Sequence, residues 1–170
     1  MYGMSKSALR LVPHDISWKD DFSAERARLT AAVEDSSVII EHVGSTSIPN
    51  VCAKPILDLA ILCGAQNLEA VAAALAALGY EYRGRFDDER GHFYAVLDKD
   101  GIRYCQAHIY TEANADWHSK LKFRDRLREN VELPREYHDY KTALAQKVSD
   151  KSEYARIKSN WVDTFILKIL

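Results

Sequence analysis

Apolar residues along the first half of the chain alternate between helical and strand-like spacing. Apolar side chains three or four positions apart predict helices, whereas β-branched or nearly continuous apolar runs predict strands. This pattern predicts, in chain order, a helix over 18–33, strands over 37–43 and 55–62, and a helix over 68–78. The last of these helices is expected to take Asn67 as its N-cap and to end at Gly79.

The second half of the chain passes from strands to helices. Strands are expected over 80–84, 92–97 and 102–111, with a charged loop over 85–91 and a tight hairpin at Asp100-Gly101. Three more helices are expected over about 114–130, 134–148 and 151–169. This order predicts an α+β fold, with a short mixed β-sheet, packed helices and a C-terminal helical cluster. No linker-like segment divides the chain, so we expect residues 1–170 to form a single domain.

The strand over 102–111 is expected to present two different faces, because alternate side chains of a strand point to opposite sides of the sheet. The face expected to pack against the core carries Arg103, Cys105, Ala107 and Ile109. The face expected to carry chemistry holds Tyr104, Gln106, His108 and Tyr110.

Composition narrows the range of functions. The 170 residues are 47% hydrophobic and 28% charged, with a formal net charge of −2, as in an ordinary globular protein. The absence of a basic excess makes nucleic acid an unlikely partner. No signal peptide or membrane-spanning run is present, so we expect a cytoplasmic protein without a membrane partner. The three cysteines lack a Cys-x-x-Cys spacing, which argues against both a disulfide framework and a zinc site.

Two features between residues 42 and 62 are candidates for chemistry. Asp58 interrupts an apolar run, although an ionised carboxylate in a core is costly unless it is paired, protonated or bound to a cation. The turn Gly44-Ser45-Thr46-Ser47, followed by Lys54, has the small and hydroxylated residues of a phosphate cradle. The structural alternatives are an Asp58 paired with a nearby cation, an ordinary Ser/Thr turn and an exposed lysine.

The same segments carry a resemblance to a known family. Residues 42–49 (HVGSTSIP) and 53–58 (AKPILD) look like the GrpB family, in which a nucleotidyltransferase fold is recognised. The similarity continues in residues 123–128 (FRDRLR) and in the pairs Tyr137-x-x-x-Lys141 and Tyr154-x-x-x-Lys158. It therefore covers nearly the whole chain.

The resemblance implies a protein that binds a nucleoside triphosphate with Mg²⁺ and transfers a nucleotidyl group to a small acceptor. In that interpretation Asp58 and His108 are the catalytic residues and the metal ligands. Phosphates or the nucleotide would be bound by Gly44, Ser45, Thr46, Lys54, Arg124, Tyr154 and Lys158. Mg²⁺ is the expected cofactor, because carboxylate-bound Mg²⁺ commonly neutralises a triphosphate.

One departure from the fold's pattern supports a second interpretation. Enzymes with this fold carry another acid two positions after the first, and this chain has Ala60 there. The alternative is a noncatalytic nucleotide- or phosphate-binding accessory module, a role that also suits GrpB-like domains fused to dephospho-CoA kinase. Oligomeric state is not predicted.

Several candidates have structural alternatives of their own. His108 is either a ligand or general base, or a strand histidine bonded to a neighbour. Arg124 is either a phosphate donor, as the resemblance suggests, or part of a solvated charged helix face. Tyr154 and Lys158, four apart on one helix face, either point at bound phosphates or pack as core and snorkelling side chains. His42 and Arg90 are weaker candidates.

Overall fold

The sheet lies at the centre of the molecule. The structure is a computed structural model and describes residues 2–5, 9–33, 35, 37–87 and 92–169. Six strands form one sheet, β1 (Met4–Ser5), β2 (Ile39–Val43), β3 (Leu57–Leu62), β4 (Glu81–Asp87), β5 (His92–Lys99) and β6 (Ile102–Tyr110). Their order is β2-β3-β6-β5-β4, with β1 paired to β6. The sheet is mixed because β3 and β6 are parallel while the other pairs are antiparallel.

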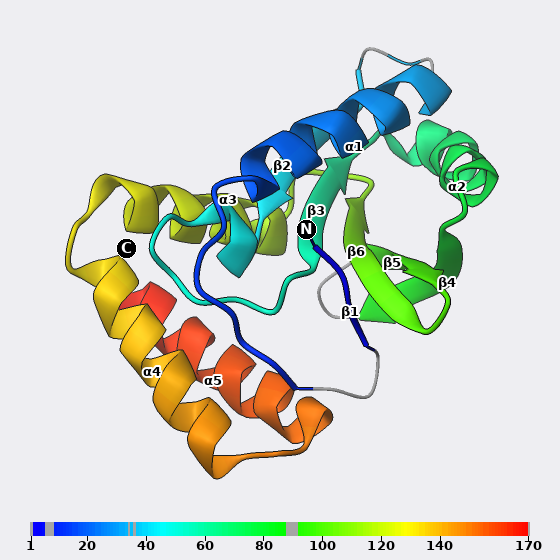
Figure 1. Cartoon of the computed structure of the whole chain (residues 1–170). Coiled ribbons are helices and arrows are strands. Elements are labelled where there is room, and N and C mark those ends of the chain that lie inside the picture. The colour runs from blue at the N-terminus through cyan, green and yellow to red at the C-terminus, as the bar shows by residue number, and fades with distance from the viewer. Residues whose placement is uncertain (1, 6–8, 34, 36, 88–91, 170) are drawn as a thin grey trace.

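The helices divide between the two faces of this sheet. The helices are α1 (Trp18–Val33), α2 (Leu68–Ala77), α3 (Ala115–Glu129), α4 (Leu133–Lys147) and α5 (Lys151–Ile169). Helices α1 and α2 lie together on one side, while α4 and α5 form a separate antiparallel pair (Figure 1). The α+β fold with a mixed sheet and a C-terminal helical cluster is thus confirmed.

Each face of the sheet has its own core. On the face toward α1 and α2, apolar side chains of β3 and β6 are fully buried, namely Leu57, Leu59, Ile61, Cys105, Ala107 and Ile109. On the opposite face, Ala60 and Tyr110 pack against Trp117 of α3. A third cluster joins α3, α4 and α5 to the loop after β2 through Ile48 and Val51. This last cluster fixes α5 relative to the loop that precedes β3.

The expected alternation of β6 is correct from Cys105 to Ile109 and wrong for the two residues before it. Leu97 pairs with Cys105, but the next residue, Asp98, pairs with Arg103, so Tyr104 is an extra residue in β6. A bulge of this kind reverses the side to which the preceding side chains point. Arg103 therefore lies on the same side as Gln106, and Tyr104 packs against the α1–α2 core.

Two local expectations are also corrected. Residues 85–87 belong to strand β4 and not to a loop; residues 88–91, with Arg90, lie outside the described residues. Asn67 makes no side-chain capping bond, because it lies in the short 3₁₀ helix η2 (Ala65–Asn67) with αR backbone angles. Its amide instead donates to the Asp35 carboxylate at 2.6 Å. Asn114 caps α3 as expected, accepting from the Trp117 N–H at 3.0 Å.

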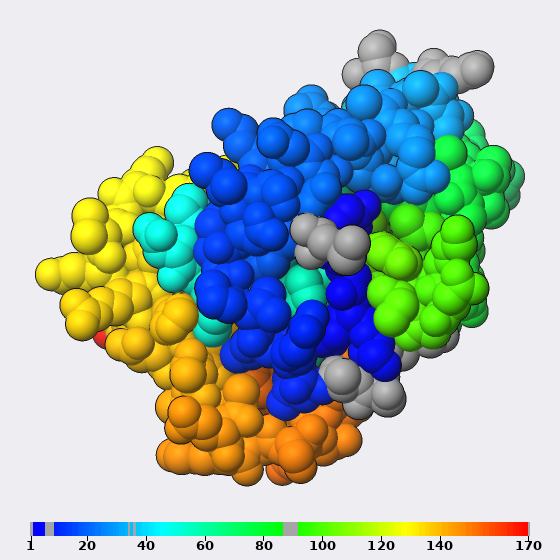
Figure 2. Space-filling view, viewed as in Figure 1, coloured from blue at the N-terminus to red at the C-terminus, as the bar shows by residue number. Residues whose placement is uncertain are grey.

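The segment before α1 ties the two halves of the molecule together. Val12 and Ala53 form an isolated antiparallel bridge between this segment and the loop before β3. In Figure 2 the segment, in dark blue, covers the loop region and reaches the pair α4–α5. None of the described helices combines the length and the hydrophobicity needed to span a membrane.

Candidate functional site

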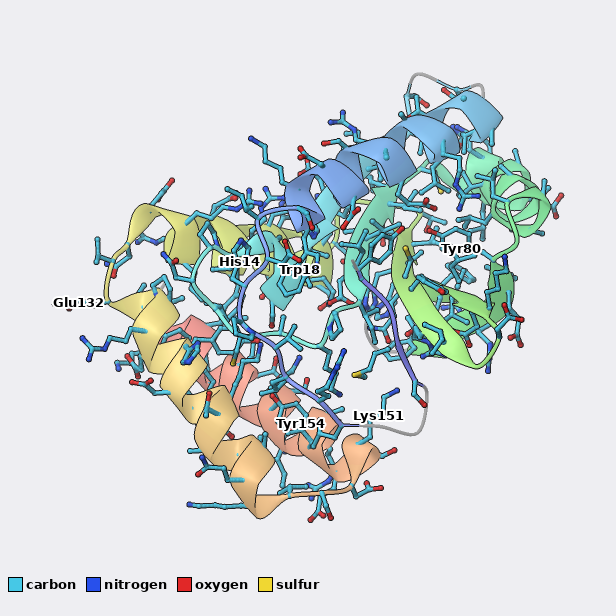
Figure 3. The ribbon with its side chains drawn as sticks, viewed as in Figure 1. His14, Trp18, Tyr80, Glu132, Lys151 and Tyr154 are labelled. Carbon is cyan, nitrogen blue, oxygen red and sulfur yellow. The ribbon has the colours of Figure 1, made fainter. Side chains whose placement is uncertain are left out.

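A cavity of about 770 Å³ opens between the sheet and the C-terminal helices. Side chains from β3, β5 and β6 line one wall, and side chains from α3, α4 and α5 line the other. Figure 3 shows Lys151 and Tyr154 projecting from the first turns of α5 on the side of that helix that faces the sheet. A cavity of this size is ordinary for a small-molecule ligand.

Gly44 and Asp58 are in direct contact at the base of this cavity. Gly44 has φ of 70° and ψ of −172°, a backbone conformation open almost only to glycine. A Cβ atom on Gly44 would lie 2.8 Å from the Cβ and Cγ atoms of Asp58. In the sheet register Val43 pairs with Asp58, which brings the turn directly beside the carboxylate. The glycine turn and the acid on the next strand, which are separate features of the sequence, therefore form one local structure.

Asp58 is bound by an amide and not by a cation. The Gln106 Nε2 atom donates to Asp58 Oδ1 at 2.8 Å, and the Tyr94 hydroxyl donates to Gln106 Oε1 at 2.6 Å. Arg103, a cation that could have paired with Asp58 in the structural alternative, pairs with Asp98 at 2.9 Å. Burial raises the pKa of Asp58, against the opposing effects of Lys158 and the Gln106 hydrogen bond. Asp58 is thus an enclosed carboxyl whose proton affinity is higher than usual.

The hydroxyl groups of the Gly-Ser turn are already engaged with protein. Ser45 Oγ lies 3.0 Å from the Tyr137 hydroxyl of α4, which links the turn to the helical cluster. Thr46 Oγ1 lies 2.9 Å from His42 Nε2, and both residues are buried. Burial, with a smaller effect of Arg128, lowers the pKa of His42 to about 3, so this imidazole is neutral. Gly44, Ser45 and Thr46 all line the cavity.

Three lysines concentrate positive charge beside Asp58. The Lys54 Nζ atom lies 4.9 Å from the centre of the Tyr154 ring, and burial followed by Lys158 lowers the pKa of Lys54 to about 8. Lys141 is almost fully buried and donates to the Cys52 carbonyl oxygen. Burial, again followed by Lys158, lowers the pKa of Lys141 to about 7. The lowered values show that the cavity opposes the positive charge that these residues bring to it.

A polar cluster occupies the neighbouring wall around His108. His108 Nδ1 lies 3.4 Å from His92 Nε2, and His92 Nδ1 lies 3.4 Å from Asp116 Oδ2. The Lys120 ammonium and the Tyr110 hydroxyl both donate to Asp116, at 3.0 and 2.6 Å. Burial lowers the pKa of His108 well below its usual range, as does the nearby Lys120. His108 is therefore neutral at physiological pH.

The structure does not bring Arg124 to this cavity. Its guanidinium donates to Glu41 at 2.7 Å, to Asp125 at 2.7 Å and to the His42 carbonyl oxygen at 3.0 Å. The side chain is buried against the edge strand β2, where it lines a separate hollow near Arg128. The placement expected for Arg124 among the phosphate-binding residues is thus corrected, because four of its five N–H donors bind two carboxylates and a carbonyl. The other predicted residues, Gly44, Ser45, Thr46, Lys54, Asp58, His108, Tyr154 and Lys158, all line the cavity.

The donor set around Asp58 does not fit a magnesium ion held by the protein. Among the described residues, no three His, Cys, Asp or Glu side chains lie together as a metal site. Ala60 stands where the second acid is expected, and it pairs in register with His108, an imidazole. Mg²⁺ prefers oxygen ligands, and the lysines of the cavity would repel it.

Several residues that line the cavity were not predicted as site residues from the sequence. Gln106 and Tyr94 orient Asp58, and Lys120, Lys141, His92 and Phe86 complete the wall. Gln106 lies on the face of β6 that was expected to hold functional side chains. Lys141 belongs to the pair Tyr137-x-x-x-Lys141, which is part of the family resemblance. The sequence position of His92 does not indicate a functional role, because only the pairing of β5 with β6 brings His92 next to His108.

Comparisons with known proteins agree with the resemblance seen in the sequence. The sequence profile described as "GrpB protein" matches residues 8–168. The glutamate-rich protein GrpB of Alkalihalophilus pseudofirmus is 30% identical over 173 residues, which cover 98% of each chain. The protein YqkA of Bacillus subtilis is 32% identical over 164 residues, covering 94% of this chain but only 46% of YqkA. This chain thus spans less than half the length of that relative.

A solved structure shares the whole fold. The crystal structure of the conserved protein GrpB from Enterococcus faecalis superposes with a TM-score of 0.82 at 26% sequence identity, covering 94% of this chain and 96% of the other. The matched length, the relatives and the shared structure lead to one conclusion: the chain belongs to the GrpB family.

Proposed function

We propose that this protein binds a nucleotide through its phosphates in the cavity between the sheet and helix α5. The observation that supports it is the gathering of three lysines, Lys54, Lys141 and Lys158, on the lining of one cavity. Lys158 has no carboxylate partner within the described residues, and its charge lowers the pKa of both other lysines. Negative phosphate oxygens would relieve this repulsion, as they do at other lysine-lined anion sites.

The neighbouring groups suit a phosphorylated ligand better than a simple carboxylate. Ser45 Oγ has one hydrogen-bond partner, the Tyr137 hydroxyl, among the described residues, and a hydroxyl can both donate and accept, so Ser45 can also bind a ligand oxygen in the cavity that it lines. Tyr154 has a buried hydroxyl without a hydrogen-bond partner in the structure, and it lines the same part of the cavity as Lys54. A buried hydroxyl without a partner is costly, and a ligand oxygen would satisfy it.

Thermal unfolding with and without nucleotides tests this proposal. A nucleoside triphosphate at about 100 times its Kd should stabilise the fold by about 2.7 kcal/mol. We expect a shift with ATP both in Mg²⁺ and in chelator, because the lysines and not a metal carry the binding. Lys158→Ala should abolish the shift and leave the free protein at least as stable as the wild type, since it removes a repelling charge.

Arg156→Ala is the matched control for this variant. Arg156 is an exposed residue of the same helix outside the cavity lining, and its removal changes the net charge equally. A shift that is lost equally in both variants would indicate nonspecific charge attraction and contradict the proposal. A shift that appears only with Mg²⁺ would instead favour a metal-dependent site at Asp58.

Nucleotidyl transfer in the same cavity is a second candidate, favoured by Asp58. Its raised pKa suits a group that takes the proton from an acceptor hydroxyl. The acceptor oxygen would form a bond to the α-phosphorus while pyrophosphate leaves. Release of pyrophosphate from ATP, with a small-molecule cell extract as acceptor source, should be lost in Asp58→Asn while ATP binding persists. Release no greater than a protein-free blank would overturn the transfer.

A further inference from the structure

One end of the cavity is lined by aromatic side chains, which have no part in the proposed phosphate binding by the lysines. Phe86 of β4, His92 and Tyr94 of β5 and His108 of β6 line this end. The Phe86 ring centre lies 4.8 Å from that of His92 and 4.9 Å from that of Tyr94. The Tyr94 and His108 ring centres are 5.4 Å apart. These four residues, called the aromatic end below, form a continuous ring surface that meets the base of the cavity at Gln106.

Phe86 is placed in the cavity by an irregularity in the edge strand. Arg85 pairs with Phe93 and Asp87 with His92, so Phe86 has no paired residue on β5. Such bulges often re-aim a side chain beside a functional site. Phe86 remains 56% exposed, so the three neighbouring rings leave part of its side chain uncovered. Single exposed apolar residues are common, but this one lines a cavity and rests on three other rings.

The strand position opposite Tyr94 carries no side chain. Gly84 lies opposite Tyr94 in the sheet register. A Cβ atom built on Gly84 would meet nothing within 4 Å. Position 84 therefore places no side chain opposite Tyr94, and the space there is free of the described residues.

Tyr94 and His108 add no charge to the aromatic end, whereas lysines line the rest of the cavity. The Tyr94 hydroxyl is engaged with Gln106, which leaves its ring as an apolar surface. Burial and the nearby Lys120 hold the pKa of His108 far below neutrality, so its imidazole carries no charge. Neutral rings attract planar groups by stacking and offer little to phosphate.

We propose that the aromatic end is the subsite for the base of the bound nucleotide. The base stacks on Phe86, and the phosphates extend past Asp58 to Lys54 and Lys158. This inference rests on the proposed function and adds to it the ring-bearing half of the ligand and its direction in the cavity. Because stacking tolerates every base, the subsite selects nucleotides over inorganic polyphosphates, with purines favoured for their larger ring area.

The test separates the two ends of the ligand by using ATP and inorganic triphosphate as probes. Isothermal titration calorimetry should show that Phe86→Ala weakens ATP binding roughly 10-fold and leaves triphosphate binding unchanged. Lys158→Ala should weaken the binding of both. Tyr82→Ala is the matched control, because Tyr82 is an exposed aromatic residue of the same strand outside the cavity lining. It should leave both affinities unchanged.

The possible outcomes distinguish the subsite from the site as a whole. Equal ATP affinity in Phe86→Ala and wild type, or equal losses for ATP and triphosphate, would overturn the base subsite while nucleotide binding stands. A wild-type protein that binds neither probe would overturn the proposed function and this inference with it. As a second measurement, 2-aminopurine riboside triphosphate should be quenched on binding to wild type and not to Phe86→Ala.

Discussion

The Gly44 backbone packs so closely against the Asp58 side chain that no room is left for a Cβ atom at position 44. We expect Gly44→Ala to lower the free energy of unfolding by roughly 3 kcal/mol, because it combines a strained backbone with a Cβ pressed against Asp58. Urea unfolding measures this value. Gly101→Ala is the control, since Gly101 also has a positive φ, of 77°, but open space around it. Equal losses in the two variants would show that contact with Asp58 adds nothing.

The individual residues of the site were predicted unevenly, for a physical reason. Asp58 and Gly44 stood out because a buried acid and a glycine turn are locally unusual, whatever surrounds them. Arg124 carried no local signal of where its side chain would point. Its partners Glu41 and His42 are more than eighty positions away and were decided by the packing of α3 on β2.

At the scale of elements, the start of α2 shows how a neighbouring segment overrides a local preference. An asparagine that caps a helix N-terminus can be replaced by aspartate, because aspartate also accepts the capping hydrogen bond and its negative charge interacts favourably with the helix dipole. Asn67 instead donates to Asp35, so we expect Asn67→Asp to destabilise the fold by about 1 kcal/mol through like-charge repulsion. Thermal unfolding measures the change. The double variant Asp35→Asn, Asn67→Asp restores a donor and an acceptor and should recover most of the loss. A fully stable single variant would favour the capping role.

The element boundaries themselves were largely readable from the sequence. The predicted range 18–33 coincides with α1, and Asp100-Gly101 forms the hairpin turn with both residues at positive φ. The β-bulges at Tyr104 and Phe86 were not predictable, because an extra residue in a strand leaves no mark on its composition. They decide which way Arg103 and Phe86 point, and so they shape the cavity.

At the scale of the whole molecule, Lys141 connects the helical cluster to the loop before β3. Its pKa is about 7 in the fold, against 10.5 in the unfolded chain. Between these values the unfolded chain binds more protons, so the contribution of Lys141 to stability rises with pH across this window. We expect the stability of wild type relative to Lys141→Met to rise by on the order of 4 kcal/mol from pH 7 to pH 10.5.

Urea unfolding of both proteins across this pH range provides the measurement. Lys147→Met serves as the control, because Lys147 is an exposed residue of the same helix. Its stability curve should run parallel to that of the wild type. Parallel curves for Lys141→Met as well would mean that Lys141 keeps its charge in the folded protein.

The α+β class, the order of the elements and the glycine turn with its acid could be predicted from the chain alone, because periodicity, turn residues and a costly buried charge are local properties. Which side chains meet in the cavity depends on the three-dimensional packing. The parallel pairing of β3 with β6 places Gln106 beside Asp58, and the packing of α4 and α5 gathers Lys141 and Lys158 around it. These contacts depend on strand order, register and helix packing between distant segments, which no single stretch of the chain encodes.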